Sequence, residues 1–324
     1  MRSILAFGYH DQSAPRHWNL KKLYEGRGLT MVECHTTARG LTAKWRDLGR
    51  KFHAMPQDAE AVLVMFPGHT LVLLAWHLTR HPRKRLIFDA FISLWDTQVL
   101  DRKKYSVLNP IAWALYLLDW LSMHLADEVL IDTEEHRTYL IRTFGLRPDR
   151  VTAVPVGTRP DLFKPGMPHS YQGGTFNVIF YGTYIPLQGI EHILAAAAKL
   201  QASHPDVHFT LVGTGQTYPA MRKFAENLKL RNVTFRDRIP YEELPRFLQS
   251  GHVSLGIFGT SRKAKRVIPH KVYDAVACGV PVITMDSPAI REKYREWQGV
   301  HLVPPGDSEA LARKIAELRD GKKW

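Results

Sequence analysis

Short apolar runs alternate with longer amphipathic segments along the whole chain. Glycine or polar turns follow many of the runs, and segments with helical periodicity, such as 187–200 and 308–318, separate most of them. The predicted strands are Ser3–Phe7, Thr30–Cys34, Ala61–Phe66, Arg85–Asp89, Glu128–Ile131, Val151–Val154, Phe176–Tyr181, His208–Val212, Val233–Phe235, Val253–Ile257, Val280–Thr284 and His301–Val303. This βαβ alternation predicts an α/β protein with two doubly wound, Rossmann-like domains.

A segment rich in proline and glycine, residues 155–174, separates the two sets of strands. We interpret it as the linker between a first domain, residues 1–155, and a second domain, residues 175–324. The chain length of 324 residues agrees, because single cores stop growing at roughly 250 to 300 residues. Since parallel sheets bind ligands beyond the carboxyl ends of their strands, we expect the two domains to face a cleft between them.

One predicted helix carries a cation at an unfavourable place. Pro269 is expected at its first position and Gly279 just past its end, so Lys271 lies in the first turn. The helix dipole disfavours a cation there unless an anion lies between the ammonium and the free backbone N–H groups. Asp274 and Cys278 share the face of Lys271. The alternative is a surface helix with a weak Lys271–Asp274 pair.

The loop before this helix and two glycine turns strengthen the interpretation as an anion site. The loop 259–266 is rich in cations, among them Lys263, Lys265 and Arg266. The turns contain Gly182 and Gly189 after one strand, and Gly213 and Gly215 after the next. Neither turn has the GxGxxG pattern, and many α/β proteins have such turns for geometric reasons alone. Together with the cationic loop they indicate a nucleotide.

The net charge of +13 requires an anionic partner, such as nucleic acid, a membrane surface or a phosphorylated substrate. Zinc-finger spacing, RNP-type aromatic strands and basic heptads are absent from the sequence, which argues against nucleic acid. Cys34 and Cys278 are far apart and give no disulfide framework, so we expect a reducing cytoplasm. The amino-terminal apolar run breaks at Gly8, which indicates a first strand and not a signal peptide.

Two further segments bear on membrane contact. Residues 38–55 have apolar side chains at helical spacing surrounded by cations. This pattern suits a helix on an anionic membrane surface and equally a helix packed on the core with a solvated face. Residues 107–126 are the longest apolar stretch, but Asn109, Pro110, Asp119 and His124 interrupt it, so we expect a buried segment and not a membrane span.

Two motifs of the second half resemble a known family. Pro-His-Lys-Val-Tyr-Asp-Ala-Val-Ala-Cys-Gly-Val-Pro-Val-Ile-Thr at 269–284 and Leu-Val-Pro-Pro-Gly-Asp-Ser-Glu-Ala-Leu at 302–311 closely resemble the donor domain of family 4 retaining glycosyltransferases of the GT-B fold. The resemblance covers residues 151–320. Phe-Pro-Gly-His at 66–69 and Asp-Ala-Phe-Ile-Ser-Leu-Trp-Asp-Thr at 89–97 are similar to a bacterial subgroup of it. The resemblance implies transfer of a sugar from a nucleotide-diphosphate donor with retention of the anomeric configuration, without a cofactor or a catalytic metal.

The resemblance also implies roles for residues. Asp274 matches the second acid of the Glu-x7-Glu motif, which holds the ribose, but Arg266 stands where the first acid belongs. The family's phosphate-binding Arg and Lys would fall on Thr183 and Gln188. We therefore expect Lys271, with Arg266, Lys263 or Lys265, to stabilise the leaving diphosphate. Asp286, Ser287–Ala289 and Glu292 match the loop that faces the donor sugar.

The candidate site residues form two sets. The catalytic candidates are Lys271, Arg266, His69 and Asp96, the last with Asp89 and Asp101–Arg102 as structural alternatives. The donor-binding candidates are Gly182, Thr183, Gln188, Gly213, Gly215, Arg238, Lys263, Lys265, His270, Asp274, Ser287, Ala289 and Glu292. No metal ligands are expected, because the sequence has no Asp-x-Asp.

We therefore expect a retaining, metal-independent glycosyltransferase with a nucleotide-sugar donor and a glycan or lipid-linked acceptor, located in the cytoplasm or peripherally at the inner face of the membrane. Two alternatives stay open: a degenerate protein that binds nucleotide sugars without catalysis, and a GT-B-type epimerase or hydrolase. Relatives usually continue beyond the helix of 308–318 with a segment that crosses back to the first domain. This sequence stops at Trp324, so we expect looser domain closure.

Overall fold

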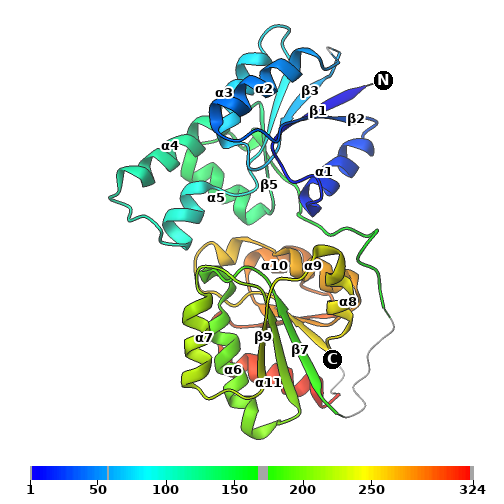
Figure 1. The fold of residues 1–324 in the computed structure, drawn as a ribbon, viewed down its shortest axis with the longest axis vertical. Helices are drawn as coiled ribbons and strands as arrows, with labels where there is room; N and C mark the ends of the chain where they lie inside the picture. The colour runs from blue at the N-terminus through cyan, green and yellow to red at the C-terminus, as the bar shows by residue number, and fades with distance from the viewer. Residues whose placement is uncertain (1, 57, 167–173, 322–324) are drawn as a thin grey trace. The chain divides into compact units, whose positions relative to one another are not determined.

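The computed structural model describes residues 2–56, 58–166 and 174–321. The chain divides into two compact units, Met1–Val156 and Gly157–Trp324, and each has its own six-stranded parallel sheet (Figure 1). The division falls at the start of the predicted linker 155–174. Part of that linker lies outside the described residues, and residues 157–166 belong to the second unit.

The first unit is a doubly wound α/β sheet with the strand order β2-β1-β3-β4-β5-β6. Its strands are β1 (Ser3–Gly8), β2 (Thr30–His35), β3 (Ala61–Val64), β4 (Arg85–Asp89), β5 (Glu128–Ile131) and β6 (Val151–Ala153). Its helices are α1 (Pro15–Glu25), α2 (Leu41–His53), α3 (Val72–Leu78), α4 (Pro110–Leu125) and α5 (Glu134–Phe144), with short helical segments η1 (His69–Leu71), η3 (Pro148–Arg150) and the π-helix η2 (Trp95–Asp101).

The alternation of side chains along β1 explains why both faces of this sheet are covered. Leu5 and Phe7 point to one face and join the core formed with α2, α3, α4 and α5. Ile4 and Ala6 point to the other face and pack with Leu20 and Tyr24 of α1. Strands buried on both faces have to be apolar throughout, which is why they read as continuous runs in the sequence.

The second unit has the strand order β12-β11-β10-β7-β8-β9. Its strands are β7 (Phe176–Tyr181), β8 (Val207–Val212), β9 (Val233–Arg236), β10 (Val253–Leu255), β11 (Val282–Met285) and β12 (Val300–Val303). Its helices are α6 (Ile190–Ser203), α7 (Tyr218–Asn227), α8 (Leu244–Gln249), α9 (His270–Ala277), α10 (Pro288–Tyr294) and α11 (Ser308–Arg319), with short 3-10 segments η4 (Pro186–Gln188), η5 (Tyr241–Glu243) and η6 (Ala264–Arg266).

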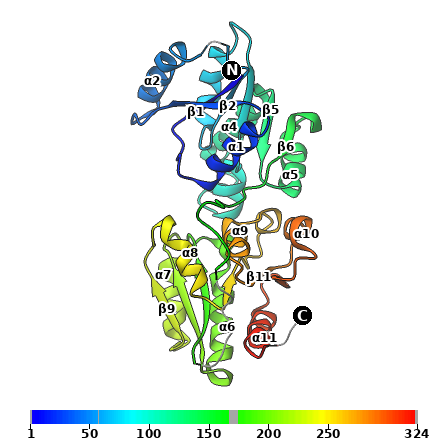
Figure 2. The ribbon, with the colours of Figure 1, turned by 90° about the vertical axis from the view of Figure 1, so that its right-hand side faces the viewer.

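The helices of the second unit also divide between the faces of the sheet. α6 and α11 pack side by side and share one core cluster with β7 and β8 (Figure 2). α9 lies against β10 and β11. The parallel order brings the carboxyl ends of β7, β8, β10 and β11 to one edge, where the loops that carry the candidate residues begin.

The predicted α/β fold with two parallel sheets is confirmed, and all predicted strands are present with small differences at their ends. One detail differs at the helix of Lys271. Pro269 occupies the N-cap of α9 with extended backbone (ψ 150°), and His270 is the first helical residue. Gly279 follows the helix with φ +72°, as a glycine after a helix end should.

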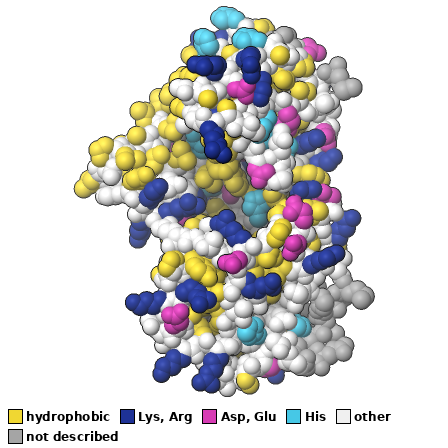
Figure 3. Space-filling view, in the orientation of Figure 1, with side chains coloured by type: hydrophobic (Ala, Val, Ile, Leu, Met, Phe, Trp, Pro, Cys, Tyr) yellow, Lys and Arg dark blue, Asp and Glu magenta, His cyan; other side chains and the backbone are white. Residues whose placement is uncertain are grey.

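The prediction that residues 107–126 are buried is wrong. α4 directs Ala112, Asp119, Ser122 and Met123 inward, whereas apolar side chains project outward. The exposed ones are Leu108, Ile111, Trp113, Leu117 and Trp120. They lie just before α4 and along its outward side, where Figure 3 shows a hydrophobic surface. Of the polar interruptions, Asp119 lies on the inner face, where it accepts hydrogen bonds from the backbone N–H groups of Leu94 and Trp95.

The helix within residues 38–55 packs on the core. Leu48 and Phe52 of α2 are buried in the main core cluster, and the indole of Trp45 donates to the carbonyl of Thr70. Only Leu41 of its apolar stripe is exposed, so α2 offers no apolar face to a membrane. Over the described residues, none of the helices combines the length and the apolarity that crossing a bilayer requires.

Candidate functional site

The glycine turns after β7 and β8 lie against each other. Gly213 has a φ of +127°, and a Cβ atom added there would lie 2.0 Å from the carbonyl oxygen of Gly182. A Cβ atom on Gly182 would lie 2.9 Å from the Nζ atom of Lys271. The two turns can therefore approach each other, and the Lys271 ammonium, only because both positions lack a side chain.

Lys271 reaches from the first turn of α9 to this junction. Its Nζ atom donates to Oε1 of Gln188 at 2.6 Å and lies 3.6 Å from the centre of the Phe180 ring. The side chain is buried, and burial lowers its pKa well below the ordinary value. No carboxylate within the described part of the chain is recorded in an ion pair with Lys271. A buried amine held only by an amide and an aromatic ring is suited to receive an anion.

Asp274, one turn further along α9, lies in a different network. Its Oδ1 accepts a hydrogen bond from the hydroxyl of Thr158, and its Oδ2 accepts one from the hydroxyl of Tyr181 at 2.6 Å. The carboxyl is fully buried, and although these hydrogen bonds act in the opposite direction, burial raises its pKa to about 6. Lys271 and Asp274 therefore do not form the surface pair that was the alternative interpretation. To hold a ribose, Asp274 would have to exchange one of its two hydroxyl partners.

The cations of the loop 259–266 differ in exposure. Lys263 is buried, Arg266 is half-buried and Lys265 is exposed. The 3-10 segment η6, which contains Lys265 and Arg266, contacts α10. His270 is half-buried at the first position of α9. The loop thus leads into the amino-terminal end of α9, which favours anions, and also contacts α10.

A hollow of about 650 Å³ lies along α10. Its lining residues are Asp286, Ser287, Pro288, Arg291, Glu292 and Arg295. Ser287 is the N-cap of α10, and its hydroxyl accepts from the backbone N–H of Ile290. Asp286, Ser287 and Glu292, three of the residues expected to face the donor sugar, thus line the same hollow. Ala289 is fully buried and does not line the hollow, because it lies on the inner face of α10.

Two other donor-binding candidates lie on exposed turns at the carboxyl ends of strands. Thr183 follows β7, and Arg238 follows β9. Gln188, which stands where the family places a lysine, is buried and bonded to Lys271. The Nζ atom of Lys271 thus reaches the side chain at the position of the missing cation.

In the first unit, His69 is buried at the start of η1. Its Nε2 lies 3.2 Å from the carbonyl oxygen of Ile92 and 3.4 Å from a carboxylate oxygen of Asp119. Burial lowers its pKa to about 4, so the imidazole is neutral at pH 7. His69 also lines an apolar cavity of about 170 Å³ between α2, α3 and α4, together with Leu41, Trp45, Thr70, Leu73, Leu118, Leu121, Ser122 and Leu125.

Asp96 lies fully buried in the π-helix η2, a distortion that often marks functional sites. Its Oδ2 lies 3.6 Å from Nε2 of His136, whose Nδ1 lies 2.7 Å from a carboxylate oxygen of Asp132. Asp89, one structural alternative, is bonded to Arg16, whose Nη2 donates to its Oδ1 at 2.7 Å. Asp101, the other, is buried at the end of the same π-helix.

Several residues that were not predicted from the sequence contact the candidate residues in the structure. Thr158 and Tyr181 hold Asp274, and Asp132 and His136 extend the network of Asp96. Asp132 and His136 could have been found, because they are four positions apart at a helix start just after a predicted strand. Thr158 has no such signal, since it contacts a residue more than a hundred positions away.

Comparisons with known proteins agree with this fold. Residues 169–323 match the family model of glycosyl transferases group 1. The chain is 26% identical over 211 residues to a D-inositol 3-phosphate glycosyltransferase of Acidothermus cellulolyticus, covering 60% of this chain and 46% of that protein. It is 27% identical over 248 residues to a chitobiosyldiphosphodolichol beta-mannosyltransferase of Eremothecium gossypii, covering 66% and 50%. The chain thus spans about half the length of these curated relatives.

Solved structures resemble the whole chain. Sucrose-phosphate synthase from Thermosynechococcus elongatus superposes with a TM-score of 0.68 at 17% identity, covering 98% of this chain and 90% of that one. The Anabaena protein HepE in complex with UDP also has a TM-score of 0.68, at 15% identity, covering 100% and 91%. These similarities establish the GT-B fold. The fold of the chain and the match of residues 169–323 to the group 1 glycosyl transferases therefore agree.

Proposed function

We propose that the protein is a retaining glycosyltransferase that transfers a sugar from a nucleotide-diphosphate donor to a glycan or lipid-linked acceptor. The observation that carries the proposal is the buried amine of Lys271 at the junction of two glycine turns. A diphosphate placed there would pair with the ammonium of Lys271. It would also accept hydrogen bonds from the backbone N–H groups of the turns and of α9. HepE, a protein of the same fold, binds UDP.

The same placement explains how the chain could assist the reaction. As the bond from sugar to phosphate breaks, negative charge develops on the diphosphate, and a cation already fixed beside it stabilises that charge. Arg266 and Lys263 lie in the loop just before α9 and add to the positive potential. We propose that these three side chains replace the phosphate-binding cations that are missing at Thr183 and Gln188, without a metal ion at the diphosphate.

The hollow at α10 is the proposed place of the donor sugar. Its carboxylates, Asp286 and Glu292, and the hydroxyl of Ser287 are groups that bind sugar hydroxyls. Arg291 donates to Asp286 and thereby orients that carboxylate at the hollow. In a retaining reaction the leaving phosphate can itself take the proton of the acceptor. The proposal therefore requires no separate protein base, and His69 and Asp96 are proposed to shape the acceptor site.

An amphiphilic acceptor is supported by the first unit. The cavity lined by His69 is apolar, and the exposed side chains of α4 follow the exposed cations Lys103 and Lys104. Apolar side chains next to cations are what a protein needs to rest on an anionic membrane. We therefore propose a lipid-linked acceptor, a cytoplasmic protein and peripheral contact with the membrane through α4.

The test is binding of UDP and other nucleotides, followed by turnover. Lys271→Met keeps a long apolar side chain and removes the charge, so UDP affinity should fall about 10- to 100-fold, in line with the loss of a charge-assisted contact. Lys84→Met is the matched control, because Lys84 is a buried lysine of the first unit. Equal UDP affinity in the wild type and Lys271→Met would refute the proposed site.

Turnover then separates the remaining alternatives. Release of UDP from UDP-sugars in the presence of lipid-linked acceptors supports transfer. Release of UDP with water alone indicates a hydrolase, and interconversion of the donor sugar without release of UDP indicates an epimerase. Tight nucleotide binding with none of these products would identify a degenerate binding protein and contradict the proposed activity.

A further inference from the structure

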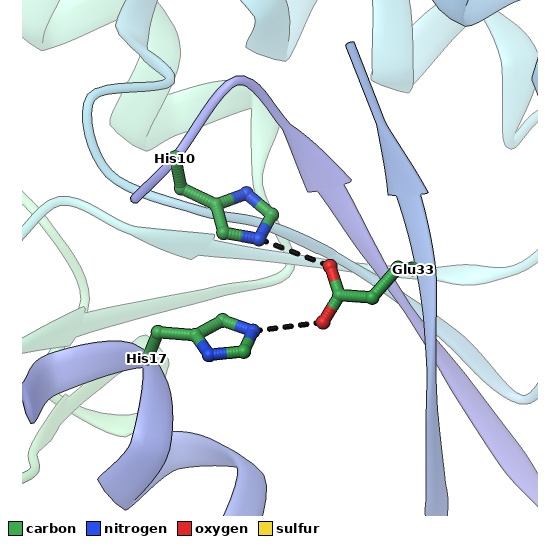
Figure 4. Close-up of side chains that lie close together, drawn as sticks. All are labelled: His10, His17 and Glu33. Carbon is green, nitrogen blue, oxygen red and sulfur yellow. Dashed lines mark hydrogen bonds and ion pairs between the residues drawn. The ribbon is translucent and has the colours of Figure 1, made fainter. Parts of the chain in front are cut away.

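Three side chains of the first unit converge at the carboxyl end of β1. His10 follows β1, His17 lies in the first half of α1, and Glu33 lies in the neighbouring strand β2. Nε2 of His10 is 3.0 Å from one carboxylate oxygen of Glu33, and Nε2 of His17 is 2.8 Å from the other. Figure 4 shows both rings pointing at the same carboxylate from the same side.

The ligand atoms of the three side chains lie close enough for one metal ion to join them. One nitrogen of each histidine and one oxygen of Glu33 all lie within 4.8 Å of one another. A tetrahedral ion with ligand distances of about 2.0–2.2 Å separates neighbouring ligand atoms by about 3.4 Å, so the side chains would move slightly inward on binding. The two imidazole rings are stacked, with centroids 5.0 Å apart and planes 20° from parallel, so both Nε2 atoms can reach a single point.

Further side chains hold the three groups in place. Gln12 donates to the oxygen of Glu33 that faces His10, at 3.2 Å. His35, in β2, has its Nε2 3.0 Å from the carbonyl oxygen of His10 and its ring edge-on to the His10 ring. Such partners fix the orientation of metal ligands in known sites.

The exposure of the three ligands also suits the entry of a cation. His10 and His17 are buried, whereas 32% of the Glu33 side chain is exposed. An ion can therefore enter from the side of Glu33, and coordination positions stay open toward solvent.

We propose that His10, His17 and Glu33 form a binding site for a divalent transition-metal ion of the zinc class. Two imidazole nitrogens and one carboxylate are ligands that zinc and neighbouring transition metals prefer, and three protein ligands leave a position for water or for an oxygen of a bound molecule. The ion ties the loop after β1 and the start of α1 to β2. This site is separate from the diphosphate site proposed in the second unit, which does not use a metal.

The competing arrangement is a hydrogen-bonded triad without an ion, in which the Nε2 atoms carry protons donated to Glu33. Metal binding requires the other tautomer, in which the ring proton lies on Nδ1 and Nε2 offers its lone pair to the ion. The two arrangements therefore differ in whether the three side chains bind zinc.

The experiment is a zinc titration of the full chain, without a histidine tag and stripped by a chelator, followed by calorimetry. The expected result is one zinc ion per chain. Glu33→Gln, which retains shape and a hydrogen-bonding oxygen, and the double variant His10→Ala/His17→Ala should each weaken this binding more than about 100-fold. His204→Ala removes a half-buried histidine of the second unit and should leave binding unchanged.

Cobalt(II) provides a second readout, because its visible spectrum reports nitrogen and oxygen ligands at the site. Circular dichroism and thermal unfolding of each variant without metal show that the chain remains folded. Equal zinc stoichiometry and affinity in the wild type, Glu33→Gln and the double histidine variant would overturn the proposal, as would the absence of a tight site in the wild type.

Discussion

At the scale of single residues, the charge state of Lys271 connects ligand binding to pH. Burial lowers the pKa of Lys271 well below its ordinary value, whereas a bound diphosphate favours the charged amine. Binding should therefore take up a proton, and UDP affinity should fall as the pH rises above the lowered pKa of the free protein. Calorimetry in several buffers measures this uptake. A pH-independent affinity that Lys271→Met does not alter would contradict it.

Asp274 should lower the stability of the protein at neutral pH. Its folded pKa of about 6 exceeds the ordinary pKa of 3.8, so the folded state binds more protons between these values. The stability contributed by the protonated form is present below pH 3.8 and is lost as the pH rises through about 6. Asp274→Asn should therefore raise the free energy of unfolding at pH 7 by about 2–3 kcal/mol, measured by denaturant titration.

The pH dependence is the sharper part of that prediction. The amide introduced by Asp274→Asn would still accept a hydrogen bond from one hydroxyl and donate to the other, so the packing is retained. The stabilisation should shrink toward zero near pH 4, where the wild-type carboxyl is itself protonated in the folded state. A constant difference between pH 4 and pH 8 would show that the carboxyl does not titrate as described.

For single residues, the sequence predicted the place of a side chain on its helix better than the side chains that it contacts. Helical periodicity correctly places Lys271 and Asp274 one turn apart, and capping places Lys271 in the first turn. The same periodicity suggested that they share an environment, whereas Lys271 contacts Gln188 and Asp274 contacts Thr158 and Tyr181. Those partners come from distant segments, and a spacing rule within one helix contains no information about them.

At the scale of elements, the junction of the β7 and β8 turns should be the least tolerant part of the second unit. Gly213→Ala places a Cβ atom against the Gly182 carbonyl at a backbone conformation that alanine disfavours. It should destabilise the protein by about 2–4 kcal/mol and abolish UDP binding. Gly28→Ala is the matched control, because Gly28 also has a positive φ, +76°, but open space at its Cβ position.

The outer surface of α4 should mediate membrane contact. Trp113→Ser with Leu117→Ser removes two exposed apolar side chains, and burial of each in a bilayer interface is worth about 1.5–3 kcal/mol. Sedimentation with anionic vesicles should show at least a tenfold weaker association, with unchanged thermal stability. Trp297→Ser, at an exposed tryptophan of the second unit, should leave association unchanged. Equal vesicle binding by the wild type, the double variant and Trp297→Ser would exclude α4 as the surface that contacts the membrane.

The strands were easier to predict from the sequence than the buried face of a helix. A strand buried on both faces is a continuous apolar run, as in β1 and β3, and such a run has one interpretation when a glycine or polar turn ends it. α4 is apolar nearly all around, so its inner face cannot be identified from hydrophobicity. What identifies it is the hydrogen bonding of Asp119 and Ser122 to the chain, which only the tertiary structure supplies.

At the scale of the whole molecule, the two units have separate cores. The cluster of the second unit contains no residue of the first, and the clusters of the first unit contain none of the second. Calorimetric unfolding should therefore show two transitions. UDP at 100 times its dissociation constant should stabilise one of them by about 2.7 kcal/mol, and zinc should shift the other. A single transition that both ligands shift equally would show that the units unfold as one.

The arrangement of α4 has a spectroscopic consequence. Six of the eight tryptophans of the chain lie in the first unit, and Trp113 and Trp120 are exposed on α4. Indole fluorescence depends on the polarity around the ring, so contact of α4 with acyl chains should shift the emission to shorter wavelength. Brominated lipids would quench these two indoles before the half-buried ones of the first unit, and the bromine position that quenches most would report how deeply the helix enters the bilayer.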